Sequence, residues 1–459
     1  MRSTGHAQPP GSPLRLLGAI LAIGFIIRIA LAPLFAGLGY DMDILRNWAQ
    51  TLADRPLGDF YATATAPDHL PGDLWILNVM AEVFGALGAE NFSGTPFLFA
   101  LKLIPAIADV LVGTGIFLVV AIYRPHTLAV RATAMYMLNP ASVFLSSVWG
   151  QWDAVSVALL LGGFLLIRRY NWLWVLSAPL LTWAILIKPQ LAILMPLLLL
   201  LPFVRILRDD SPPVGKWSRL FLEAAFAAFL GLATMLAIIL PFAVGLPGMG
   251  TRWSLPDRFS VALDLYPFTT LGAFNLWMIP LGSLDRVSDL DTSWLSLSAN
   301  RWGMVLFGLA IAAVGARVLR LASRHAPWDL VLWGALAASL AVFTLPTRVH
   351  ERYLFPAFVF AILYAAVRGF PRQLTIIASA LSLTLLVNLA MLYGHPLEPL
   401  PDLIASGVRG VGFRAVALAN VIVLAIVLTL PTIASPLDHG SGARDIMPER
   451  RARWRRGLR

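Results

Sequence analysis

Residues 14–48 read LRLLGAILAIGFIIRIALAPLFAGLGYDMDILRNW, and this stretch decides the class of protein. Its first part, 14–35, is an apolar run of bilayer length, because about 20 helical residues cross a hydrocarbon core. The run is too long for a signal-peptide core and no convincing cleavage site follows it, so we expect it to remain as a membrane span. Two carboxylates, Asp41 and Asp43, come directly after it, at a membrane boundary.

The rest of the chain repeats this apolar character. Of the 459 residues, 58% are hydrophobic and 13% are charged, a composition more apolar than that of soluble proteins. We therefore predict an all-α polytopic membrane protein. The net charge is +10, but the arginines form short clusters between apolar runs, which is typical of topology-setting loops and argues against a nucleic-acid partner. Cysteine is absent, which excludes disulfides and thiolate chemistry.

The arginine clusters predict the topology. The apolar runs fall near 14–35, 73–88, 97–122, 132–148, 154–167, 172–187, 190–204, 220–244, 271–284, 302–320, 330–345, 354–367, 374–393 and 415–430. If 73–88 and 271–284 do not cross, the basic loops all lie on the cytoplasmic side. About twelve spans result, in a domain over 14–430 whose first outer loop is 36–96. A cytoplasmic N-terminus, 1–13, and a basic cytoplasmic tail, 431–459, flank that domain.

The same topology places the carboxylates of the first outer loop on the non-cytoplasmic face. Asp41 and Asp43 are two positions apart, so on a helix their side chains diverge by about 200°, whereas on an extended segment both could face one cavity. One of them could be a general base that deprotonates a hydroxyl group. Alternatively, either one could cap the helix that follows. The spacing leaves both interpretations open.

A second polar segment, TRVHERY at 347–353, lies on the same predicted face. Its cationic groups favour phosphate, because guanidinium groups bind phosphate oxygens in a bidentate fork. An ordinary charged helix end, with Glu351 paired to a neighbouring arginine, is the alternative. Lys188 interrupts a long apolar stretch on this face. It could extend to the membrane surface as an ordinary lysine does, but the adjoining proline and amide favour a position that lines a cavity. The candidate phosphate-binding residues are Arg348, His350, Arg352 and Lys188.

Aromatic and amide side chains on the same face favour a carbohydrate site. The segment WGQWD at 149–153 combines tryptophans with an amide and a carboxylate, and the amides at positions 190 and 275 lie on the same predicted face. The candidate sugar- or acceptor-binding residues are Trp149, Gln151, Asp153, Gln190 and Asn275. Lys102 and Asp109, seven positions apart on one predicted helix, lie on roughly one face and could form an intramembrane ion pair, either structural or catalytic.

Taken together, these segments resemble the GT-C superfamily of integral-membrane glycosyltransferases. The likeness is strongest to bacterial and archaeal proteins related to the GPI mannosyltransferase II family, with a further likeness to dolichyl-phosphate-glucose glucosyltransferases. It covers most of the chain up to about residue 367. The segments that carry it are DMD at 41–43 followed by Trp48, FY at 60–61, PG at 71–72, WGQWD at 149–153, KPQ at 188–190, NLW at 275–277 and HERY at 350–353 followed by Pro356.

The resemblance implies a fold, an activity and a location. The fold would be a GT-C-like bundle of about twelve transmembrane helices with a helical first outer loop. The activity would be inverting transfer of a hexose, mannose or glucose, from a polyprenyl-phosphate donor to a hydroxyl group of a lipid-linked, glycan or protein acceptor. The site would open on the extracytoplasmic side of a bacterial or archaeal plasma membrane. Some GT-C enzymes use a divalent metal ion and others do not, and we assign no metal ligands.

Within the resemblance, Asp41 corresponds to the acidic residue seven positions ahead of a tryptophan that acts as the base, with Asp43 beside it. The segment at 350–352 corresponds to the one that contacts the donor phosphate. The chain departs from the family where DHLPG at 68–72 replaces a common Tyr-Pro-Pro-Gly. A transporter or flippase for a lipid-linked or anionic substrate is the alternative function, because broken hydrophobic segments and intramembrane charges also fit it.

Overall fold

The computed structural model describes residues 12–88, 92–168, 172–207, 213–281, 286–321, 327–393 and 408–430. The predicted basic tail, 431–459, and residues 1–11 of the predicted N-terminus lie outside the described residues.

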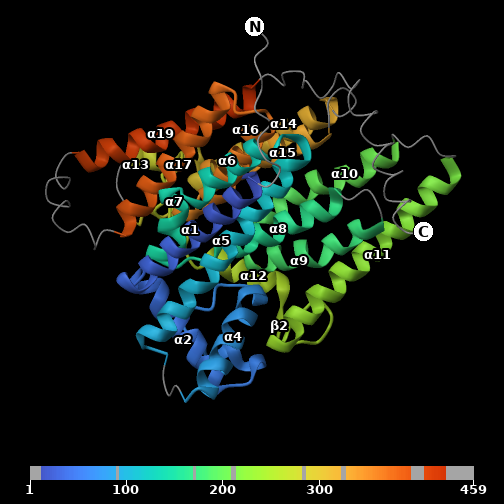
Figure 1. Ribbon diagram of the computed structural model, residues 1–459. Coiled ribbons are helices and arrows are strands. Elements are labelled where there is room, and N and C mark those ends of the chain that lie inside the picture. The colour runs from blue at the N-terminus through green and yellow to red at the C-terminus, as the bar shows by residue number, and fades with distance from the viewer. Residues whose placement is uncertain are drawn as a thin grey trace, which may run out of the picture.

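The chain is a helical membrane protein (Figure 1). Among its described residues, six helices are long and apolar enough to cross a membrane. They are α1 (Ser12–Leu31), α5 (Thr95–Tyr123), α11 (Pro213–Ile239), α14 (Ala299–Leu321), α17 (Arg372–Tyr393) and α19 (Val408–Thr429).

Shorter helices complete the bundle. They are α6 (His126–Met137), α7 (Pro140–Val143), α8 (Asp153–Arg168), α9 (Ser177–Ile187), α10 (Met195–Leu207), α15 (Pro327–Thr344) and α16 (Phe355–Val367), with the short helical turns η1 (Ala32–Leu34), η3 (Phe144–Trp149), η4 (Trp172–Leu176), η5 (Pro189–Leu194), η6 (Leu240–Phe242) and η7 (Glu351–Leu354). Several of them meet end to end, so that α6, α7 and η3 occupy the single apolar run predicted over 132–148.

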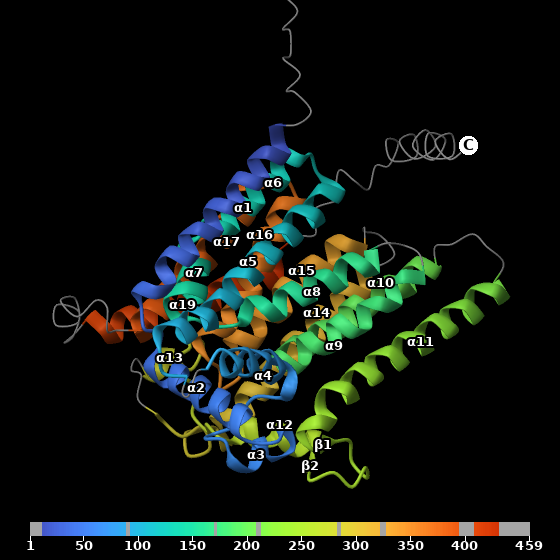
Figure 2. The same ribbon diagram turned by 60° about the horizontal axis from the view of Figure 1, so that its bottom comes forward.

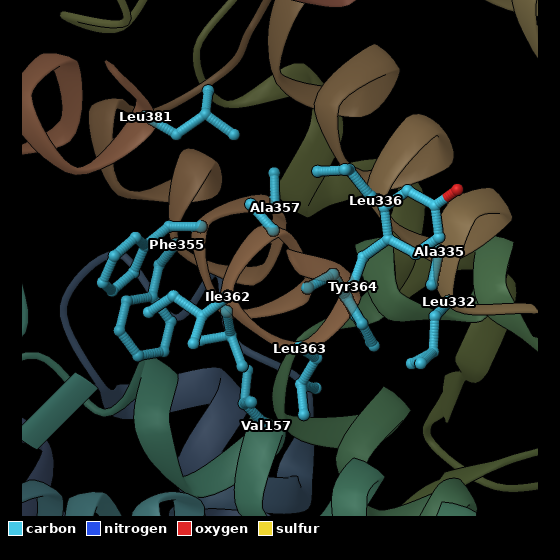
Figure 3. Close-up of a cluster of buried hydrophobic side chains, with 14 of the residues drawn as sticks. Val157, Leu332, Ala335, Leu336, Phe355, Ala357, Ile362, Leu363, Tyr364 and Leu381 are labelled. Carbon is cyan, nitrogen blue, oxygen red and sulfur yellow. The ribbon is translucent and has the colours of Figure 1, made fainter. Parts of the chain in front are cut away.

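The helix α16 forms the centre of the main core. Every residue from Phe355 to Val367 is buried, as expected for a helix that is apolar on all sides. It packs against α5, α6, α15 and α17. Figure 3 shows Ile362 and Leu363 of α16 pointing toward Val157 of α8. The core thus lies between helices that are distant in the sequence.

A smaller helical lobe lies at one end of the bundle. It contains α2 (Gly39–Asp54), η2 (Leu57–Asp59), α3 (Phe60–Thr63), α4 (Pro71–Ala86) and α12 (Leu255–Asp264), with the parallel pair β1 (Val244–Gly245) and β2 (Trp253–Ser254). Figure 2 shows these elements together below the long helices. The predicted first outer loop is therefore largely helical, and it has its own aromatic core around Trp48, Phe60 and Phe242.

The two apolar runs that we expected not to cross belong to this end of the molecule. The run 73–88 lies in α4, which has 16 residues and packs against α2, α9 and α11. The described part of 271–284 is irregular until α13 (Met278–Leu281), and an antiparallel pair, β3 (Ser293–Trp294) and β4 (Leu297–Ser298), follows it. Neither run is among the six long apolar helices of the described chain.

The predicted ion pair between Lys102 and Asp109 is wrong. Asp109 pairs instead with Arg28 of α1, whose Nε lies 2.5 Å from Asp109 Oδ2, and both side chains are almost fully buried. Tyr136 also donates to Asp109. Arg28 satisfies its other nitrogens with Ser142 and with two backbone carbonyl groups. The pair therefore ties α1 to α5, α6 and α7.

Lys102 binds backbone carbonyl groups instead of a carboxylate. Its ammonium group is buried and donates to the carbonyl groups of Ala32, Phe35 and Val148 at 3.3, 2.6 and 3.1 Å. These carbonyls lie in or next to η1 and η3, where helical hydrogen bonding ends and oxygens need other donors. Lys102 thus joins the end of the first membrane helix to the segment that precedes Gly150.

Candidate active site

Two adjoining cavities lie between the helical lobe and the long helices. The first has a volume of about 320 Å³ and the second about 550 Å³. Both cavities are lined by Asp68, His69, Tyr266, Leu271, His350 and Arg352. Because they share these residues, a molecule in one cavity can contact a molecule in the other.

Asp41 lines the first cavity from the first turn of α2. Its Oδ2 accepts a hydrogen bond from Trp149 Nε1 at 3.0 Å and a second from the amide of Gln151. No described residue hydrogen-bonds to Oδ1. One carboxylate oxygen is therefore fixed by two donors, while the other is open to the cavity.

Asp43 has a different environment. Its side chain is 71% exposed, and it pairs with Arg46 at 3.1 Å. It lines neither cavity. Since the segment is helical, the two carboxylates diverge as their spacing requires, and buried Met42 lies between them. The geometry thus separates the two candidates, and only Asp41 reaches the cavity.

The turn that carries Trp149 and Gln151 has a specific backbone conformation. Gly150 has φ = 95°, and a Cβ atom at this position would lie 3.2 Å from Lys102 Cγ. Glycine adopts this left-handed conformation without steric cost. Gly37, with φ = 84°, passes so close to the same turn that a Cβ atom would lie 2.8 Å from the Trp149 carbonyl oxygen. These contacts hold the two N–H donors in place beside Asp41.

The second cavity is mostly apolar and is also lined by several cationic groups. Its apolar walls come from α12, α14, α15 and η5, and include Ile193, Phe259, Leu263, Met304, Phe307 and Val342. Lys188, Gln190, Arg348, His350 and Arg352 line it as well. A ligand that combines an apolar part with an anionic group matches this lining.

Lys188 and Arg352 approach each other around one carboxylate. Lys188 Nζ and Arg352 Nε each lie 4.0 Å from Asp153 Oδ2. Neither this oxygen nor Arg352 Nε has a hydrogen-bond partner among the described residues. Arg352 also pairs with Glu351 at 2.9 Å. Asp153 is buried and lines neither cavity. It is therefore placed to balance the charge of the two cations and not to contact a sugar in either cavity.

Burial and charge oppose each other at Glu351 and Arg352. Burial alone would raise the pKa of Glu351, but Arg352 and His350 outweigh it and bring this pKa to about 2. Burial would likewise lower the pKa of Arg352, but the neighbouring Glu351 outweighs this effect and raises the pKa above its ordinary value. Both groups are therefore charged at neutral pH, in line with the ion pair that we weighed as the alternative for this segment.

Arg348 is held by two carboxylates. Its Nε lies 2.8 Å from Asp289 and its Nη1 lies 2.8 Å from Asp264. Asp289 is fully buried and also accepts from Thr347 and Asn300. Arg348 lines the second cavity, but its charge is already balanced there. Its clearest contribution is to fix the loop that precedes His350.

Asn275 lies away from the cavities. It is fully buried, its amide donates to the Pro346 carbonyl, and its side-chain oxygen accepts from the backbone of Trp277. It lines neither cavity, so the structure does not bring it together with the other predicted sugar-binding residues. The amide supports the backbone of an irregular segment instead.

His69 and Asp73 are site residues that the sequence analysis did not single out. His69 lines both cavities, and its Nδ1 lies 2.5 Å from Asp73 Oδ2. The signal was a histidine four positions ahead of an aspartate, across the expected start of a helix. This spacing brings the two side chains together on a helix, but it indicates a site only when the start of that helix packs against a cavity.

The described residues contain no cluster of three or more histidine, cysteine, aspartate or glutamate side chains that could hold a metal ion. No protein-family profile matches the chain, and the comparison with curated proteins finds no match.

Proposed function

We propose that this protein is a glycosyltransferase of the GT-C type, which moves a hexose from a polyprenyl-phosphate donor to an acceptor hydroxyl group. The observation that carries the proposal is the carboxylate of Asp41, held through one oxygen and open through the other. Asp41 lines one cavity, and this cavity adjoins a second, more apolar cavity whose lining includes several cationic side chains.

The acceptor would occupy the first cavity. A general base must lie within hydrogen-bond reach of the proton that it removes, and Asp41 Oδ1 is the carboxylate oxygen left open there. The N–H groups of Trp149 and Gln151 orient the carboxylate. They serve the sugar-transfer reaction by positioning Asp41, in addition to the contacts with carbohydrate that their residue types suggest.

The donor would occupy the second cavity. The apolar walls suit the polyprenyl chain, and Lys188, Arg352 and His350 suit its phosphate group. The anomeric carbon would then lie at the junction of the cavities, near the residues that line both. Gln190 lines the donor cavity and is placed to contact the phosphate or the sugar.

The transfer is a single displacement. Asp41 takes the proton of the acceptor hydroxyl, and the hydroxyl oxygen forms a bond to the anomeric carbon. The bond from this carbon to the phosphate oxygen breaks, and its electron pair leaves with the phosphate. Attack from the face opposite the leaving group inverts the anomeric configuration. The cations of the second cavity stabilise the charge that develops on the phosphate.

We further propose the GT-C topology of about twelve spans, with the site on the extracytoplasmic side of a bacterial or archaeal plasma membrane. The basic loops predict this orientation. The six long apolar helices, together with shorter apolar helices such as α9 and α15, provide candidates for these spans. The donor sugar would be mannose or glucose.

The test is transfer of label from polyprenyl-phosphate mannose or glucose to a membrane extract by the purified protein. We expect Asp41→Asn to lower kcat by about 10²-fold or more, because general bases contribute about 10²–10⁴ to rates. Asp43→Asn is the matched control, since this exposed carboxylate lies outside the cavities, and it should keep nearly full activity. Equal activity of both single variants and their double variant would contradict the scheme. Uptake of substrate into proteoliposomes without glycosylation would favour a transporter.

A further inference from the structure

His69 and Asp73 form a pair that takes no part in the reaction proposed above. The carboxylate side chain of Asp73 is 5% exposed and the imidazole of His69 is 26% exposed. Nδ1 of His69 is committed to Asp73, and no described residue hydrogen-bonds to Nε2. An imidazole held in this way by a buried carboxylate keeps its remaining nitrogen in a fixed orientation.

The backbone around His69 is fixed on several sides. Tyr61 donates to the His69 carbonyl oxygen at 2.7 Å, and the Trp48 ring meets the imidazole edge-on with 5.0 Å between ring centroids. At the start of α4, a Cβ atom on Gly72 would lie 2.4 Å from the Leu186 carbonyl carbon. The loop therefore docks directly on the end of α9, two residues before Lys188.

This docking places His69 at the junction of the cavities. It lines the first cavity together with Asp41, and the second together with Lys188 and Arg352. A sugar between the base and the phosphate-binding cations would have to pass this position. His69 is thus close to the proposed position of the bond that breaks, and it is near enough to the phosphate-binding Lys188 for that cation to act on its pKa.

We propose that His69 is the acid that protonates the departing phosphate, with Asp73 as its positioning residue. The inference rests on the proposed glycosyl transfer. As the bond from the anomeric carbon to oxygen breaks, the phosphate monoester leaves as a dianion. His69 Nε2 then gives its proton to a phosphate oxygen, so that the product departs as a monoanion. The acceptor proton resides on Asp41, and solvent afterwards returns a proton to His69.

The pKa of His69 determines whether it can donate a proton at neutral pH. Burial lowers the pKa of His69, but Asp73 raises it more, so the net pKa lies above the ordinary value. This elevated pKa keeps the imidazolium protonated, and so able to donate, at neutral pH. The second pKa of a phosphate monoester is about 6, so the transfer to the dianion is slightly uphill, and the departure of the product monoanion draws it forward. The charged or titratable groups around His69 are Asp68 beside it, Asp73 on α4, Lys188 ahead of η5, Asp41 on α2, Tyr266, and His350, Glu351 and Arg352 at η7.

The pH dependence of transfer distinguishes an acid from a structural residue. An acid must be protonated, so kcat/KM of the natural protein should fall as the pH rises through the elevated pKa of His69. Removing the carboxylate in Asp73→Asn should move this alkaline fall to lower pH by about one unit, because an adjacent opposite charge no longer favours the imidazolium. A residue that only supports the fold would change the rate without moving the profile.

The experiment compares the full-length natural protein, His69→Gln, Asp73→Asn and the control His126→Gln across pH, with labelled polyprenyl-phosphate hexose as donor. His126 is exposed at the start of α6 and lines neither cavity, so its variant should keep the natural profile. For His69→Gln we expect kcat to fall about 10²-fold, KM for the donor to change little, and the alkaline fall to disappear.

Each outcome decides the proposal. An alkaline fall that persists unchanged in His69→Gln overturns the role of His69 and leaves the glycosyl transfer standing. Absence of transfer by the natural protein overturns both. If His69→Gln does not fold, as judged by size-exclusion chromatography, the natural protein and Asp73→Asn decide. A natural profile with no alkaline fall, or an Asp73→Asn profile that does not shift, overturns the proposal, and a fall that shifts downward supports it.

Discussion

At the scale of single residues, the open oxygen of Asp41 depends on the donors that hold the other oxygen. Gln151→Ala removes one of two N–H donors to Oδ2 and leaves Trp149 alone. A hydrogen bond to a charged group contributes about 1.5–3 kcal/mol, so we expect kcat for hexose transfer to fall at least about tenfold. Steady-state kinetics with the labelled donor measures the change.

The chain offers a matched control for this variant. Gln50, also on α2, donates to Asp54 at 3.0 Å in an exposed pair. Gln50→Ala removes the same kind of bond outside the cavities and should leave kcat within about twofold, since exposed pairs contribute little. A similar effect of both substitutions would mean that the Gln151 amide has no special relation to the reaction.

At the scale of elements, the ion pair between Arg28 and Asp109 decides how α1 joins the bundle. Asp109→Ala would leave a buried arginine without its carboxylate, and breaking a buried pair costs about 3–5 kcal/mol. We therefore expect a clearly lowered Tm in detergent. Replacing both residues by leucine should recover part of the loss, because the unpaired charge disappears as well. The control is Arg219, whose side chain is 61% exposed where it pairs with Glu223, and Arg219→Ala should hardly change Tm. Equal losses from Asp109→Ala and from the double variant would contradict this view.

The same elements show how far sequence reasoning reaches. Apolar runs of bilayer length predicted the helical membrane architecture, because a continuous apolar run of about 20 residues crosses the hydrocarbon core as a helix that satisfies its own backbone hydrogen bonds. The partner of Asp109 was missed, since Arg28 lies 81 positions away and spacing on one helix pointed to Lys102. The gathering of Trp149 and Gln151 around Asp41 also depends on tertiary contacts, over more than 100 positions. Their residue types suggested a site, but only the structure shows what each one touches.

At the scale of the whole molecule, the proposed function requires that the lobe with Asp41 faces the outside of the cell. The chain contains no cysteine, so single cysteines can be introduced into the natural sequence without a background of reactive thiols. Leu295 is 87% exposed in the turn between β3 and β4, within the outer loops of the predicted topology. Gln373 is exposed at the start of α17, next to a basic loop predicted to be cytoplasmic.

We expect a membrane-impermeant maleimide to label Leu295→Cys in intact cells. Gln373→Cys should be labelled only after the membrane is opened, because the basic loops stay on the cytoplasmic side. Labelling after permeabilisation shows that both thiols are reactive and serves as the control. The reverse pattern would place the cavities in the cytoplasm, where the base and the phosphate-binding cations would meet donors of the opposite orientation. Labelling of both thiols in intact cells would show that the basic loop beside Gln373 is not cytoplasmic, and would contradict the twelve-span topology.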